Sequence, residues 1–215
     1  MAVSAATAAC WNTGTFEWCW SKGMSSRRYI GQSAIVTGGG LGMGRAIALH
    51  VPINNAGIMH PDDDLLEHAS DAAWDRTLAV NFHGPFHCCR FSIPHLLASG
   101  GGAIVSIASV GGVMGTTRPL YGAGKGAVIG MTTLIARQYA AQGLRANVVL
   151  PAGVNTPMLD VVMKYQRTVR QPVYNPMQRV AESGEIAGVV AYLASADAAG
   201  VNGALWPADG GTLAV

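Results

Sequence analysis

The chain has 215 residues, half of them apolar and 12% of them charged, with a formal net charge of +2. That is enough apolar material for the core of one domain, and the 28 glycines are typical of an α/β protein with tight turns rather than a coiled coil or a disordered segment. The positive charge is slight and scattered, which excludes a nucleic-acid-binding surface. No apolar run reaches the roughly 18 residues that a membrane-spanning helix needs.

The cysteines indicate the compartment. There are four of them, and two are neighbours in sequence that would form only a strained bridge. So low a count does not fit a disulfide scaffold, and it favours a reducing compartment such as the cytoplasm. The four are Cys10, Cys19, Cys88 and Cys89.

The first 23 residues do not fit the pattern that follows them. They hold three of the five Trp, and they show neither helical nor strand periodicity. We therefore expect residues 1–23 to be an extension outside the fold and residues 24–215 to form a single domain. The part before Glu17 is rich in Ala, Ser and Thr and lacks acidic residues, which leaves organelle targeting as a weaker alternative.

Beyond the extension, strands alternate with helices. Short apolar, often β-branched runs predict buried parallel strands over residues 33–38, 101–109, 144–153 and 203–211. Helical patterns predict helices over residues 42–50, 71–99, 121–142 and 185–195. Ser70 is the expected cap of the second helix, with Asp71 in its first turn. The alternation predicts an α/β fold in which helices cover both faces of a parallel sheet.

A glycine-rich segment, TGGGLGMG, occupies residues 37–44 between a predicted strand and a predicted helix. Glycine allows positive φ in such a turn, and it lets a pyrophosphate approach the backbone N–H groups of the helix N-terminus. The spacing is T-G-x-x-x-G-x-G rather than G-x-G-x-x-G. The segment predicts nucleotide binding, with an ordinary glycine-rich turn as the alternative.

Tyr121 and Lys125 are four residues apart on a predicted helix and so share one of its faces. A free Tyr titrates at about pH 10, and a nearby ammonium group favours the phenolate and lowers that pKa. The Tyr can then exchange a proton with a substrate oxygen. Ser109 lies twelve residues earlier, at the carboxyl end of a predicted strand, where open α/β sheets bind ligands.

Together these segments resemble the short-chain dehydrogenase/reductase family. The resemblance covers residues 30–213 apart from one gap, and the motifs follow the family's order: TGGGLGMG, NNAG, AVNFHG, IVSIAS, YGAGK, LPAGVNTPM and DGG. It implies a Rossmann-like fold and reversible hydride transfer between NAD or NADP and a small secondary alcohol or ketone. It also implies a homo-oligomer.

The resemblance assigns roles by position. Tyr121 would be the general acid–base, Lys125 would lower its pKa and hold the nicotinamide ribose, and Ser109 would hydrogen-bond the substrate oxygen. Asn81 would hold a helix distortion and a water that relays protons. The residues implied to contact the cofactor are Gly38, Gly40, Leu41, Gly42, Met43, Asn55, Ala56, Gly57, Tyr121, Lys125, Pro151, Val154 and Thr156.

The gap lies between the glycine-rich segment and NNAG. Family members have two more strand–helix units there, whereas only nine residues separate Gly44 from Asn54 in this chain. We therefore expect an internal deletion near residues 50–53, and a truncated sheet that lacks strands two and three with their helices. The acidic residue that would hold the cofactor ribose falls in this gap, so NAD and NADP are not distinguished. The alternative to an active oxidoreductase is thus an inactive variant that at most associates with full-length subunits.

Three other groups of residues invite alternative interpretations. His83, His87, Cys88 and Cys89 have the spacing of metal ligands, but the resemblance places them on a helix that packs against a partner subunit, so no metal site is expected. Asp62, Asp63 and Asp64 are expected to form a solvated turn and helix start. Met158, Met163 and Met177 lie in residues 157–184, the family's substrate lid, where they suit either an apolar substrate or core filling.

Overall fold

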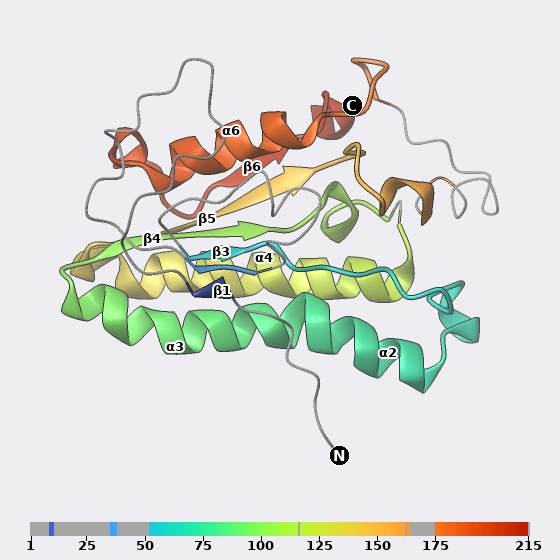
Figure 1. Cartoon of the computed structure of the whole chain (residues 1–215), viewed down its shortest axis with the longest axis horizontal. Coiled ribbons are helices and arrows are strands. Elements are labelled where there is room, and N and C mark those ends of the chain that lie inside the picture. Colours follow the sequence, from blue (N-terminus) through green and yellow to red (C-terminus); the bar gives the residue numbers. More distant parts are fainter. Residues whose placement is uncertain are drawn as a thin grey trace.

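The computed structural model describes residues 9–10, 35–37, 52–115, 117–161, 163 and 175–214. Within these residues the chain forms a sheet in the order β1-β2-β3-β4-β5-β6 (Figure 1). Strands β2 to β6 run parallel, and β1 is antiparallel to β2. The strands are β1 Ala9–Cys10, β2 Ile35–Val36, β3 Ile53–Asn54, β4 Gly102–Ile107, β5 Leu144–Pro151 and β6 Leu205–Ala208. The predicted parallel sheet is confirmed.

Helices cover both faces of the sheet, as the alternating pattern predicts. Helix α6 lies on one face, and α3 and α4 lie on the other (Figure 1). The α-helices are α2 Asp71–Leu78, α3 Gly84–Ala98, α4 Pro119–Tyr139 and α6 Ser183–Ala194. Short helical turns complete the described chain: η2 Leu66–His68, η4 Val110–Gly112, η5 Ala140–Gln142, η6 Ala196–Ala198 and η7 Thr212–Ala214. None of the described helices combines the length and apolarity required to cross a bilayer.

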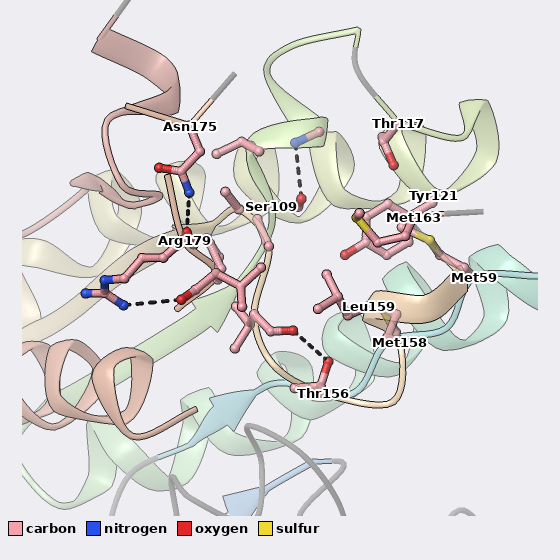
Figure 2. Close-up of a pocket in the computed structure, with 18 of the residues that line it drawn as sticks. Met59, Ser109, Thr117, Tyr121, Thr156, Met158, Leu159, Met163, Asn175 and Arg179 are labelled. Atoms are coloured by element: carbon pink, nitrogen blue, oxygen red, sulfur yellow. Dashed lines mark hydrogen bonds between the residues drawn. The ribbon is translucent and has the colours of Figure 1, made fainter. Parts of the chain in front are cut away.

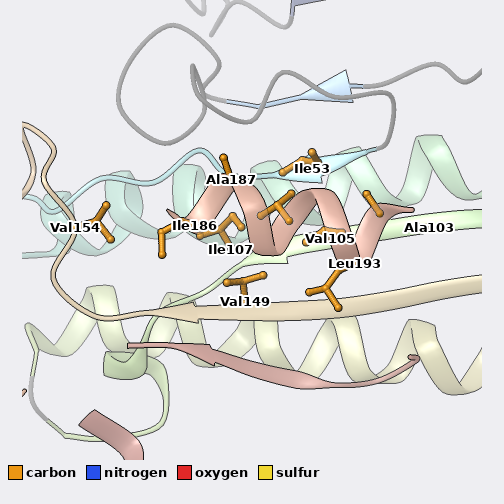
Figure 3. Close-up of a cluster of buried hydrophobic side chains, with 11 residues drawn as sticks. Ile53, Ala103, Val105, Ile107, Val149, Val154, Ile186, Ala187 and Leu193 are labelled. Carbon is orange, nitrogen blue, oxygen red and sulfur yellow. The ribbon is translucent and has the colours of Figure 1, made fainter. Parts of the chain in front are cut away.

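The core has two parts because side chains alternate between the faces of a strand. In β4, Val105 and Ile107 pack toward α6, where they meet Ile186 and Leu193 (Figure 3). Ile104 points to the opposite face and packs with residues of α3, α4 and β5. Both faces of β4 are buried, which is why its sequence is mostly apolar rather than alternating, and its buried polar residue Ser106 is hydrogen-bonded to Asn54 and Thr132.

The predicted helix over residues 71–99 contains a distortion. Ser70 caps its start, since its hydroxyl accepts a hydrogen bond from the N–H of Ala73 at 3.2 Å. The α-helical pattern is interrupted by a π-helical turn, η3 Ala79–His83, before α3 continues. Such a turn widens the backbone and often marks a functional site. Asn81 lies within it and is buried.

On one side of β3, the described sheet continues through β2 and β1, which are only two residues long each. Val36 pairs directly with Ile53, so the strand before the glycine-rich segment lies beside the strand that leads into NNAG. Ala9 and Cys10, from the segment expected to lie outside the domain, pair with β2. The remainder of residues 1–23 and the helix expected over 42–50 lie outside the described residues, and the domain boundary stays a prediction.

The interpretation of residues 62–64 as a solvated turn is wrong for Asp63. Its side chain is completely buried, and its carboxylate oxygens accept hydrogen bonds from the backbone N–H groups of Leu120 and Tyr121. The unpaired N–H groups of a helix start make an anion stable there, even when it is far away in sequence. Asp62 is exposed, as expected.

Candidate active site

The predicted Ser, Tyr and Lys meet where the carboxyl ends of β4 and β5 face the start of α4. Ser109 follows β4 by two residues, while Tyr121 and Lys125 occupy the first two turns of α4. Tyr121 is 8% exposed and Lys125 is 4% exposed. The Ser109 side chain hydrogen-bonds the Tyr121 phenol. This is the end of a parallel sheet at which α/β proteins bind ligands.

Burial controls the ionisation of Tyr121 and Lys125. It raises the pKa of Tyr121 to about 12, and the hydrogen bond with Ser109 only partly opposes this rise. It lowers the pKa of Lys125 to about 8. The Lys125 ammonium donates to the carbonyl of Ile107 at 2.8 Å and lies 5.8 Å from the centre of the Tyr121 ring. The Tyr121 pKa therefore moves opposite to the direction predicted from the Tyr–Lys spacing, because burial of the phenol is the dominant effect.

Asn81 joins the π-helical turn to the segment after NNAG. Its Oδ1 accepts from the N–H of Ile58 at 2.8 Å, and its Nδ2 donates to the carbonyl of Ile58 at 2.9 Å. Next to this pair, a Cβ on Gly57 would come within 3.2 Å of the Lys125 Nζ and 3.7 Å of the Asn81 Oδ1. Glycine thus allows three segments that are distant in sequence to pack closely.

Replacing Asn81 by Ala is expected to lower the free energy of unfolding by roughly 2–5 kcal/mol, because both backbone groups of Ile58 lose their partner in a buried place. Urea denaturation measures this change. Asn155→Ala is the matched control: among the described residues, the exposed Asn155 side chain donates only to the Glu182 carboxylate, so its removal should change stability by less than about 0.5 kcal/mol. Equal losses in the two variants would contradict the anchoring role of Asn81.

Thr37, the first residue of the glycine-rich segment, contacts NNAG. Its hydroxyl oxygen accepts from the N–H groups of Asn55 and Ala56, both at 3.0 Å, and its carbonyl accepts from the Asn55 side chain at 3.2 Å. The Asn55 Oδ1 is buried and has no hydrogen-bond donor among the described residues. A buried acceptor without a partner fits a ligand that supplies a donor. Gly38, Gly40, Leu41, Gly42 and Met43 lie outside the described residues.

A cavity of about 430 Å³ opens beside Tyr121. Ser109, Tyr121 and Thr156 border it from three different parts of the chain (Figure 2). Pro151 and Val154 also line it, so these predicted residues lie together. The predicted residues Asn55, Ala56, Gly57 and Lys125 are not part of its lining, although Gly57 and Lys125 pack against each other close behind Tyr121.

Several residues that line the cavity were not predicted. Met59 follows NNAG by two residues, and Thr117 precedes Tyr121 by four. Their positions relative to the motifs are the only signals that the sequence offers for them. Of the three Met expected at a substrate lid, Met158 and Met163 line this cavity, whereas Met177 lines a neighbouring one.

The charged residue of the lining is already paired. Arg179 is the sole charged side chain among the described residues that line the cavity, and it forms two hydrogen bonds of 2.7 and 2.6 Å with Glu185. Both terminal nitrogens of the guanidinium are thereby engaged by the Glu185 carboxylate. The described part of the cavity therefore offers an apolar wall and neutral polar groups.

Among the His and Cys residues of η3 and α3, His87 contacts an aromatic ring and Cys89 lies in the apolar core. His87 stacks on Phe91, with ring centroids 6.2 Å apart, and Cys89 is buried in the core against Asn54. Within the ranges that the structure describes, no three His, Cys, Asp or Glu side chains are grouped so that they could hold a metal ion.

Comparison with known proteins agrees with this architecture. Residues 43–212 match the model of the family described as Enoyl-(Acyl carrier protein) reductase. The chain is 36% identical over 164 residues to the cyclohexanol dehydrogenase of Acinetobacter sp. strain SE19. That match covers 76% of this chain and 63% of the relative, so the chain spans less than two thirds of the relative's length.

Two solved structures are also similar. Levodione reductase superposes with a TM-score of 0.79 and 26% identity, covering 87% of this chain and all of that chain. The protein ElxO, solved with NADP bound, gives a TM-score of 0.67 and 29% identity over 76% of this chain and 67% of its own. With the sheet order, the arrangement of Ser109, Tyr121 and Lys125 and these matches, the chain belongs to the short-chain dehydrogenase/reductase family.

Proposed function

We propose that the chain is an NAD(P)-dependent oxidoreductase that interconverts a small secondary alcohol and its ketone. The observation that carries this proposal is that Ser109 and Tyr121 line one cavity together, with Lys125 5.8 Å from the centre of the Tyr121 ring. The printed names of the relatives support it, since they include a cyclohexanol dehydrogenase and a protein solved with NADP. Because the chain spans 63% of the dehydrogenase, the activity of the whole protein is part of the proposal.

The residues present fit a nicotinamide cofactor on the nicotinamide side. The cofactor supplies hydride transfer when it is bound. Asn55, with its unpaired buried oxygen, and Gly57, which leaves room beside Lys125, would hold it near the ribose. Val154 and Thr156 would border the nicotinamide from the cavity wall. The glycine-rich residues 38–43 would take the phosphates, as the family resemblance implies.

Protonation favours the reductive direction at neutral pH. With a pKa of about 12, the Tyr121 phenol keeps its proton and is ready to donate it to a carbonyl oxygen. Ser109 would hold the same oxygen with its hydroxyl. Lys125, with a pKa of about 8, carries its charge at neutral pH and favours the phenolate that forms when Tyr121 releases the proton.

The lining of the cavity points to an uncharged, largely apolar substrate. Met59, Met158 and Leu159 supply flexible apolar walls, and thioether side chains adapt to irregular hydrocarbon shapes. The Arg179 guanidinium already has a carboxylate partner in Glu185, so a substrate carboxylate would have to compete with it. A small cyclic ketone such as cyclohexanone is therefore the first probe.

Cofactor binding is the first test. The purified chain is expected to bind NADPH or NADH at submillimolar concentration, measured by the change in nicotinamide fluorescence, and to oxidise one of them when cyclohexanone is added. The fluorescence step is independent of substrate choice. Absence of binding at millimolar concentration of either cofactor would rule out the oxidoreductase proposal for this chain.

A second candidate is an inactive subunit that pairs with other copies. It rests on the exposed aromatic side chains of α2 and α3, where Trp74 is 48% exposed and Phe91 is 67% exposed. On α3, the rings of Phe86, His87 and Phe91 contact one another in turn, and exposed apolar side chains gathered in this way are typical of protein–protein contacts. This candidate predicts self-association in sedimentation experiments, abolished by Phe91→Asp, together with no binding of either cofactor.

A further inference from the structure

The helix that carries Tyr121 has no N-cap of its own. Arg118 occupies the N-cap position without a side-chain cap, and Pro119 at the first helical position has no N–H to donate. The N–H groups of Leu120 and Tyr121 therefore need acceptors from elsewhere. Asp63 supplies both, with one carboxylate oxygen on each N–H at 2.9 Å. These residues are 57 and 58 positions apart in sequence.

The contact is reciprocal. The Nη1 of Arg118 donates to three backbone carbonyls of the loop that holds Asp63: those of His60 at 3.0 Å, Pro61 at 2.8 Å and Asp63 at 2.6 Å. Hydrogen bonds from a charged donor, or to a charged acceptor, are stronger than neutral ones. The loop over residues 60–63 and the first turn of α4 are thus held to each other from both sides.

This loop continues the segment that borders the active site. Going back along the chain from Asp63, Met59 lines the cavity, Ile58 is held by Asn81, and Gly57 lies against Lys125. At the other end of this segment, the N–H of Tyr121 donates a hydrogen bond to the Asp63 carboxylate. A displacement of the Asp63 carboxylate would therefore move the acid–base group relative to the cavity wall.

We propose that Asp63 is a positioning residue, which fixes the first turn of α4 so that the Tyr121 hydroxyl stays beside Ser109 at the mouth of the cavity. The proposal rests on the proposed function for its catalytic consequence. Its structural basis is a completely buried carboxylate that accepts hydrogen bonds from the Leu120 and Tyr121 N–H groups, and this basis is independent of the substrate. Asp63 itself would touch neither substrate nor cofactor.

The kinetic test compares Asp63→Asn and Asp63→Ala with Asp62→Asn. Asp63→Ala is expected to lower kcat at least about tenfold with little change in the KM for cofactor, because a shift of the reacting group affects the chemical step. Asp63→Asn keeps one acceptor and should fall between Asp63→Ala and the unsubstituted chain. Asp62→Asn makes the same charge change at an exposed neighbour and should leave kcat unchanged. An equal kcat in Asp63→Ala and Asp62→Asn would overturn the proposal.

A second measurement needs no activity. In Asp63→Ala, amide hydrogen exchange at Leu120 and Tyr121 is expected to accelerate, and nitration of Tyr121 by tetranitromethane, read by mass spectrometry, should become several times faster, while exchange in α6 stays the same. Unchanged exchange and nitration would overturn the positioning role. If the unsubstituted chain shows no turnover, the proposed function is contradicted. Hydrogen exchange and nitration would still decide whether Asp63 positions Tyr121.

Discussion

Tyr121→Phe is expected to lower the turnover of cyclohexanone by about 10²–10⁴-fold, the usual contribution of a positioned acid–base group. The substitution removes only the hydroxyl that exchanges the proton. The ring is 8% exposed and remains packed at the start of α4, so the affinity for NADPH should stay within about twofold of the original. Steady-state kinetics give the turnover, and fluorescence titration gives the affinity.

Tyr192→Phe is the matched control. Tyr192 is partly buried like many structural tyrosines, packs its ring on Trp206 at 5.6 Å between centroids, and belongs to the opposite face of the sheet. Removing the Tyr192 hydroxyl should therefore leave the turnover of cyclohexanone unchanged. Turnover by Tyr121→Phe at the level of Tyr192→Phe would end the acid–base assignment of Tyr121.

The second prediction with a large expected effect concerns how the free energy of unfolding depends on pH. Lys125 has a pKa of about 8 in the folded chain, against 10.5 for an unperturbed lysine. Below pH 8 both states carry the proton, and the folded state bears the full penalty of a buried charge. Between pH 8 and about 10.5 the folded state has released the proton while the unfolded state keeps it, so the free energy of unfolding rises with pH by about 3 kcal/mol.

Lys125→Met isolates this contribution. Every other titrating group is common to both chains, so the difference in unfolding free energy, original minus variant, should increase by about 3 kcal/mol from pH 8 to pH 10.5. Chemical denaturation at several pH values measures it. Parallel curves for the two chains across this range would show that burial does not lower the pKa of Lys125.

The features that the sequence predicted are those encoded by local patterns. Strands β4 and β5 follow from short apolar runs ended by Ser, Pro or Gly, and the shared face of Tyr121 and Lys125 follows from a spacing of four on a helix. Ser109 could be placed because the carboxyl end of a parallel strand is a known location for ligands. The structure brings these residues together as expected.

The features that were missed depend on packing between distant segments. Nothing in the run of three Asp distinguishes Asp63, because its burial depends on a helix start 57 residues later. The direction of the Tyr121 pKa was also wrong, since spacing reveals the neighbouring Lys but not the depth of burial. The contact between Thr37 and NNAG likewise appears only when the two strands lie side by side.

The direct pairing of β2 with β3 has a consequence for how this architecture tolerates change. The groups assigned to the chemistry come from β3 onward, and they are held by contacts among themselves: Gly57 with Lys125, Asn81 with Ile58, and Asp63 with α4. Beyond β2, only the two residues of β1 pair with the described sheet. Strand–helix units added at that margin are therefore expected to leave the contacts that hold the proton-transfer groups in place.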